Sequence, residues 1–152
     1  MELTMMNTIS IGLSQYGVTE TLGDIHNKII LNYFKEIGLA WVTNDETAWC
    51  SAFANWVALK SGKQRSHSLT ARSWLKVGRE TNIPELGDIV VFWREKKQSW
   101  KGHVGFFIGY SQDKKYIYCL GGNQGNQVNI KAYPSFRLLG FRQLQTIKKQ
   151  LR

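Results

Sequence analysis

IVVFWREKKQSWKGHVGFFIGY, residues 89–110, contains two apolar runs that are joined by a charged loop. Both runs are rich in β-branched and aromatic side chains and closely follow a glycine, which is typical of β-strands. Three further runs of this kind come after them, KYIYCL, QVNI and FRLLGFR. Links such as SQDKK are too short for the crossover that parallel strands need. Residues 87–142 therefore predict an antiparallel sheet of about five to six strands.

Residues 20–80 instead carry apolar side chains at helical spacing. One helix is predicted from Ile25 to Ile37, because Gly38 then stops the pattern. A third, short helix is predicted over 69–77. The helix between these two has a single apolar face, formed by Trp49, Ala52, Phe53, Trp56 and Val57.

Helices followed by an antiparallel sheet, with no internal repeat and no linker, predict an α+β protein. We expect one domain over residues 1–152, with a core over about 20–142 and a basic tail over 145–152.

The charge is strongly basic, with 20 lysines and arginines against 11 acidic residues and a formal net charge of +9. Such a charge attracts polyanions, including nucleic acid, anionic lipid and an acidic cell envelope. The apolar runs are too short to span a bilayer, which takes about 20 residues. The first residues, MELTMMNTIS, lack the basic start and apolar stretch of a secretory signal, so none is expected.

The two cysteines, Cys50 and Cys119, do not make a disulfide framework. We expect two free thiols, although a single bridge between them is an alternative, and interpret Cys119 as a packing residue. Paired C-x-x-C, H-E-x-x-H and acidic calcium-loop motifs are absent from the sequence. Neither a metal nor another cofactor is therefore predicted.

Cys50 lies in TAWCSAFANW, near the predicted start of a helix. A capping box of Thr43 and Glu46 would put it in the second turn. Thr47 as N-cap would put it in the first turn, where the helix dipole favours a thiolate, and we prefer this placement. A small core residue is the alternative interpretation.

A thiol nucleophile needs a base, and His103 is the best placed of the three histidines because it opens a predicted strand. His26 and His67 are expected to be exposed. The hairpin partner of that strand ends near Asn123, whose amide oxygen we expect to orient the imidazole ring. Gln124 and Asn126 are alternatives for this role. We expect the Cys50 sulfur and the His103 ring to meet across one crevice.

The ordered set WCSAFANW, ARSWL, PELGDIVVFWR, GHVGFFIGY and LGGNQGNQVNI resembles the CHAP family of cysteine peptidoglycan hydrolases, from about residue 20 to 142. It looks especially like the small phage- and prophage-associated branch. The resemblance implies a minimal papain-like fold, in which N-terminal helices pack on the sheet. It also implies Cys50 as nucleophile, His103 as base and Asn123 as the residue that orients it.

The implied substrate is bacterial peptidoglycan, cleaved at an amide bond by an amidase or endopeptidase reaction. A lysin without a signal would reach the periplasm or cell wall through a holin or a secretion system. We expect a monomer, and an inhibitor or immunity protein is a possible partner. The residues predicted to contact substrate are Trp49, Ser51, Arg72, Trp74, Trp93 and Gln124, with Trp100 as a further candidate.

Three alternatives stay open at this point. The first is a secreted antibacterial effector with the same chemistry. The second is a wall-binding module without activity. The third is a basic nucleic-acid-binding domain, which would explain the charge but not the order of Cys50, His103 and Asn123.

Overall fold

A computed structural model describes residues 7–20, 27–39 and 49–147. The helices are α1 (Thr8–Leu13), α2 (Lys28–Glu36), α3 (Cys50–Lys60) and the 3-10 helices η1 (Ala71–Lys76) and η2 (Ser135–Arg137). The strands are β1 (Arg79–Thr81), β2 (Ile89–Trp93), β3 (Gly102–Tyr110), β4 (Tyr116–Gly121), β5 (Asn129–Pro134) and β6 (Leu138–Gln143).

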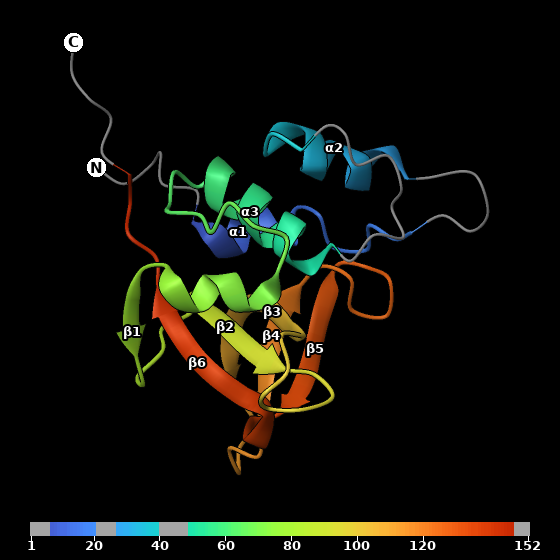
Figure 1. Cartoon of the computed structure of the whole chain (residues 1–152). Helices are drawn as coiled ribbons and strands as arrows, with labels where there is room; N and C mark the ends of the chain where they lie inside the picture. The colour runs from blue at the N-terminus through green and yellow to red at the C-terminus, as the bar shows by residue number, and fades with distance from the viewer. Residues whose placement is uncertain (1–6, 21–26, 40–48, 148–152) are drawn as a thin grey trace.

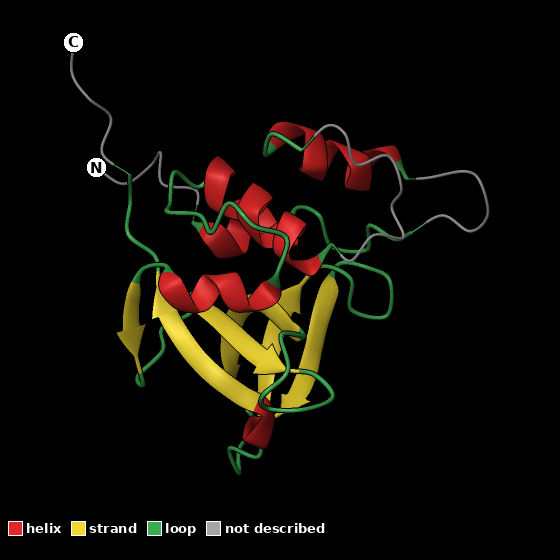
Figure 2. Cartoon of the chain, viewed as in Figure 1, coloured by secondary structure: helices red, strands yellow, loops and turns green. Residues whose placement is uncertain are grey.

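The strands form one six-stranded antiparallel sheet in the order β1-β6-β2-β3-β4-β5. Four of them, β2 to β5, follow one another as a meander, and β6 returns to lie between β1 and β2. Helices α1, α2, α3 and η1 lie on the same side of this sheet (Figures 1 and 2). The predicted α+β class and small papain-like arrangement are confirmed.

The sheet curls strongly. The rings of Phe92 on β2 and Tyr133 on β5 stack with centroids 4.7 Å apart, although two strands separate β2 from β5 in the sheet. Side chains inside this curl form one apolar cluster, in which Phe107 and Phe141 pack edge to face. The curl thus brings residues from β2, β3 and β5 together, and it shapes the site described below.

The main core lies between the helices and the opposite face of the sheet. Strand β3 contributes Val104 and Phe106 to this main core, and α3 contributes Phe53 and Val57. Each such fully buried side chain contributes about 1.5–3 kcal/mol of transfer free energy. Because both faces of β3 and β2 are covered, their sequences are continuous apolar runs without a polar alternation.

The predicted helices differ from the observed ones at their ends. Helix α2 begins at Lys28, because the Asn27 side chain caps it by accepting the amide of Ile29 at 2.7 Å. The predicted helix over 69–77 is the 3-10 helix η1. Helix α1 and strand β1 were not predicted at all.

The core extends beyond the predicted lower bound of residue 20, since Ile11 of α1 is buried in it. Gly12 packs so tightly that a Cβ there would lie 2.8 Å from Leu120 Cδ2. At the other end, the Ile147 amide donates to the Gly62 carbonyl at 2.8 Å, which ties part of the predicted tail to the domain.

Candidate active site

Cys50 is the first residue of α3, and Trp49 is its N-cap. The preferred placement in the first turn is therefore confirmed and the second-turn alternative is wrong, although the N-cap is Trp49 and not Thr47. Thr43, Glu46 and Thr47 themselves lie outside the described residues. Trp49 makes no side-chain capping bond. Burial of its indole, which donates to Glu20 Oε1 at 2.6 Å, holds the start of the helix instead.

The Cys50 thiol is nearly buried, and this loss of solvent raises its pKa. The backbone amides of Val104 and Ser51 and the charge of Arg94 act in the opposite direction. The amide of Val104 is informative because it belongs to the residue that follows His103 in β3. The sulfur thus lies against the strand that carries the predicted base.

His103 is the second residue of β3 and pairs with Phe92 of β2. It is 4% exposed, and its ring stacks on Tyr133 with centroids 5.0 Å apart. Burial lowers the pKa of His103 to about 4, helped by the nearby charges of Arg94 and Lys131. At neutral pH the imidazole is therefore uncharged and able to accept a proton.

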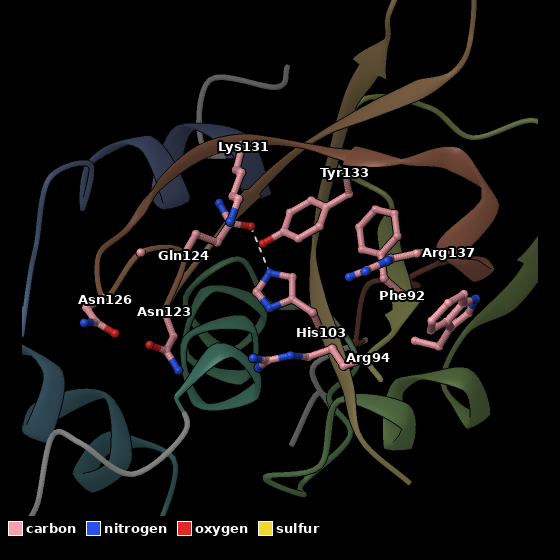
Figure 3. Close-up of a pocket in the computed structure, with 11 residues that line it drawn as sticks. Phe92, Arg94, His103, Asn123, Gln124, Asn126, Lys131, Tyr133 and Arg137 are labelled. Carbon is pink, nitrogen blue, oxygen red and sulfur yellow. Dashed lines mark hydrogen bonds between the residues drawn. The ribbon is translucent and has the colours of Figure 1, made fainter. Parts of the chain in front are cut away.

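The His103 ring is oriented by Gln124. Its Nε2 lies 2.9 Å from Gln124 Oε1 (Figure 3). The Gln124 amide cannot be turned around, because its nitrogen donates to the Cys119 carbonyl at 3.2 Å and to two oxygens of Asn129 at 2.8 and 2.9 Å. The oxygen must then face His103, so Nε2 carries the proton and donates it. Nδ1 is left as the basic nitrogen and points away from Gln124 in Figure 3.

Asn123, the predicted orienting residue, forms no hydrogen bond with His103, so this assignment is corrected to Gln124, one of the sequence alternatives. The physical reason is the turn after β4. Asn123 has a φ of 57°, and at this turn the next side chain, that of Gln124, lies against the ring, while Asn123 lines the cavity beside it. Gly121 leaves the room, since a Cβ there would lie 2.6 Å from Gln124 Oε1 and 3.3 Å from His103 Nε2.

Two adjoining cavities meet at these residues, where one crevice was predicted. Cys50 lines a cavity of about 560 Å³, together with Leu69 and Trp100. His103 lines a smaller cavity of about 330 Å³, together with Phe92 and Tyr133 from the curled part of the sheet. Arg94 and Arg137 border both, so the cavity lined by Cys50 and the cavity lined by His103 are neighbours.

Three of the predicted substrate contacts are core residues. Trp49, Ser51 and Trp74 have no exposed surface. The Trp74 indole donates to Ser51 Oγ at 2.9 Å, and Ser51 Oγ donates in turn to the Ser68 carbonyl at 2.6 Å. Their polar atoms are thus used within the fold, and the predicted direct contact of these side chains with substrate is wrong.

Arg72 is also used internally. Its guanidinium donates to the carbonyls of Lys96, Lys97 and Lys101 at 2.8–3.1 Å and so holds the loop that precedes His103. Only Trp93 among the predicted aromatic contacts borders the smaller cavity, where its indole donates to the Phe136 carbonyl at 3.3 Å. Trp100 is 71% exposed and borders the larger one.

Sequence reasoning missed several residues of the site. Arg94 directly follows β2, which pairs with β3 so that Trp93 lies opposite Gly102. The predicted antiparallel hairpin could therefore have indicated that Arg94 lies near His103. Asn129, Tyr133 and Arg137 gave no such signal, because only the curl of the sheet brings them there.

No three His, Cys, Asp or Glu side chains gather as a metal site would require, within residues 7–20, 27–39 and 49–147. Over the same residues, none of the helices has the length and apolar character needed to cross a bilayer. Cys50 and Cys119 are both free thiols.

The model of the CHAP domain family matches residues 42–123, more than half of the 152-residue chain. This segment includes both Cys50 and His103 and ends one residue before Gln124. CHAP domains are in general cysteine- and histidine-dependent peptidoglycan hydrolases. A comparison with curated proteins finds no match.

Proposed function

Because the chain belongs to the CHAP domain family, we propose that it hydrolyses an amide bond of peptidoglycan with Cys50 as nucleophile and His103 as base. One observation supports these roles most directly. The hydrogen bond with Gln124 leaves Nδ1 as the basic nitrogen of the His103 ring. The amide of the next residue on the same strand, Val104, lies against the Cys50 sulfur.

The reaction begins from neutral partners. Burial raises the pKa of Cys50 and lowers that of His103, so a thiol and an uncharged imidazole are the resting forms at pH 7. As the sulfur attacks the carbonyl carbon, its proton moves to His103 Nδ1. Gln124 Oε1 accepts the Nε2 proton throughout and so stabilises the imidazolium that forms.

The developing oxyanion lies near the start of α3. The amides of Cys50 and Ser51 are in the first turn of this 11-residue helix, where backbone N–H groups have no helical acceptor. One such donor typically lowers the barrier by about 3 kcal/mol. The buried Ser51 side chain is not needed for this, because its amide is the contributing group.

His103 then returns the proton to the leaving amine, and the C–N bond breaks to leave a thioester on Cys50. A water molecule attacks this thioester while His103 accepts its proton, and the sulfur regains that proton as the acid is released. Each cycle thus consumes one water and restores both neutral groups.

We further propose an endolysin-like role in the periplasm or cell wall, with delivery by a holin or a secretion system. The resemblance of the sequence motifs to the phage and prophage branch supports this role. The net charge of +9 also supports it, since cell wall polymers are anionic.

The test is digestion of purified sacculi by the parent protein and by Cys50→Ala, followed by mass analysis of the fragments. We expect new amine and carboxyl ends with the parent and none with the variant. Fragments that separate the peptide from the sugar would identify an amidase, and fragments cut within the peptide an endopeptidase. Equal release by the two proteins would refute the proposed chemistry.

A further inference from the structure

Three cationic side chains line the smaller cavity, and none of them pairs with a carboxylate of the described residues. Arg94 follows β2, Lys131 lies on β5 and Arg137 ends η2, and all three line the cavity. Figure 3 shows them around His103 and Tyr133. No residue that lines this cavity is acidic, and none of the three forms an ion pair with a carboxylate of the described residues.

Arg137 is the most specific of the three. Its Nε is buried and has no hydrogen-bond partner within the described part of the chain. Its Cζ lies 5.2 Å from the centre of the Trp93 ring. An aromatic ring held against a guanidinium limits its rotation but does not bond the N–H groups along its edge. That edge matches the two oxygens of a carboxylate, with which arginine forms paired hydrogen bonds.

Two of these charges act directly on His103. Arg94 and Lys131 both disfavour the protonated form of His103, which the attack by Cys50 must generate. An anion bound between them would offset this repulsion and favour proton transfer. The arrangement therefore suits a substrate that brings its own negative charge.

We propose that the smaller cavity is a carboxylate subsite, in which Arg137 and Arg94 bind a free carboxylate that the wall peptide carries next to the amide attacked by Cys50. This inference rests on the proposed function. The position follows from the cavities, because both arginines also border the one that Cys50 lines. A carboxylate held there lies close to the bond that is cut.

Binding can be tested separately from cleavage. Two synthetic stem peptides that differ only in a free α-carboxylate or a carboxamide on their glutamate would be titrated calorimetrically into Cys50→Ala protein. We expect the free acid to bind about tenfold more tightly, as for a hydrogen-bonded charge. Adding Arg137→Gln should bring the ratio of affinities close to one, and adding Arg137→Lys should retain part of it.

Lys35→Gln is the matched control, because it removes one charge from the exposed face of α2 and lines neither cavity. It should leave the ratio unchanged. Equal affinities for the two peptides, or no measurable binding of either, would overturn the subsite. So would an unchanged ratio in both Arg94→Gln and Arg137→Gln.

Cleavage of the same two peptides by protein with Cys50 intact gives the second arm, with the ratio of kcat/KM as readout. If the acid binds more tightly but the parent releases nothing from sacculi, the subsite stands and the proposed hydrolysis fails. If sacculi are digested but both peptides are cut equally, the hydrolysis stands and the subsite is refuted.

Discussion

Cys50 and Cys119 are both free and buried thiols, yet they lie in different settings. Cys50 begins a helix, is 6% exposed and lines a cavity. Cys119 lies inside β4 with no exposed surface and packs within the curl of the sheet. Burial raises the pKa of both, so acidity alone does not distinguish them.

The difference between them lies in access and in neighbours. Cys50 has a cavity in front of it and lies against the strand of His103, whereas Cys119 serves the site through its backbone. The Cys119 carbonyl accepts a hydrogen bond from Gln124, the residue that orients His103. One cysteine is thus placed to react, and the other helps to hold the group that positions the base.

Alkylation should separate the two thiols most clearly. With iodoacetamide at pH 8, we expect Cys50 of the native protein to be modified while Cys119 stays protected. Because a core strand opens only with global unfolding, which costs about 5–15 kcal/mol, the difference in rate should exceed about 10³-fold. Peptide mass mapping at timed intervals measures it. Comparable rates would show that Cys119 is accessible in the native protein, which contradicts its burial in the structure.

Gln124→Leu tests the second half of the comparison, the support of the base. Leucine is of similar size but cannot accept the Nε2 proton of His103, so the ring loses its fixed tautomer. We expect kcat/KM to fall about 10²-fold, within the range of general-base contributions. The same substitution at Asn123, which forms no hydrogen bond with His103, should have a smaller effect. A larger loss from Asn123→Leu would restore the sequence-based assignment.

The pH profile gives a smaller but more specific effect. His103 has a pKa of about 4, so activity should be level near neutrality and fall tenfold per unit as the pH drops below that value. In Gln124→Glu, a carboxylate beside the ring favours the imidazolium and raises the pKa of His103. The acid limb of kcat/KM should then move up by about one pH unit or more. In Gln124→Leu it should move down, since the hydrogen bond that raises this pKa is lost. Identical limbs in the parent and both variants would exclude His103 as the titrating base.

The sheet was predictable because its apolar runs are long and are separated by turns, and β2 and β3 form close to the predicted limits. Strand β1 was not, since RET has three mostly exposed residues and no apolar pattern. Helix α1 is also short, with six residues, and its packing on Leu120 depends on contacts far away in the sequence.

Within the site, the sequence motifs predicted Cys50 and His103, which the structure places beside adjoining cavities, but the predicted orienting residue is one position away from the observed partner of His103, Gln124. The shift arises because positive φ angles at Asn123 and Gly125 set which side chain points inward, and residue spacing does not encode this. The tryptophans near Cys50 were predicted to contact substrate. Trp49 and Trp74 instead bury their large apolar side chains in the core, and their indole N–H groups donate to acceptors inside the fold.

The smallest expected effect comes from Cys119→Ala. Its sulfur fills the space that β3 leaves beside Gly105, where an added Cβ would clash with Sγ. Removing it leaves a small void and should lower the free energy of unfolding by about 1–2 kcal/mol, measured by urea denaturation. The carbonyl that holds Gln124 is unchanged, so kcat/KM should stay within about threefold of the parent, a change in barrier of under 1 kcal/mol. A folded Cys119→Ala protein that has lost its activity would show that the second thiol takes part in the chemistry, and the contrast between the two cysteines would then fail.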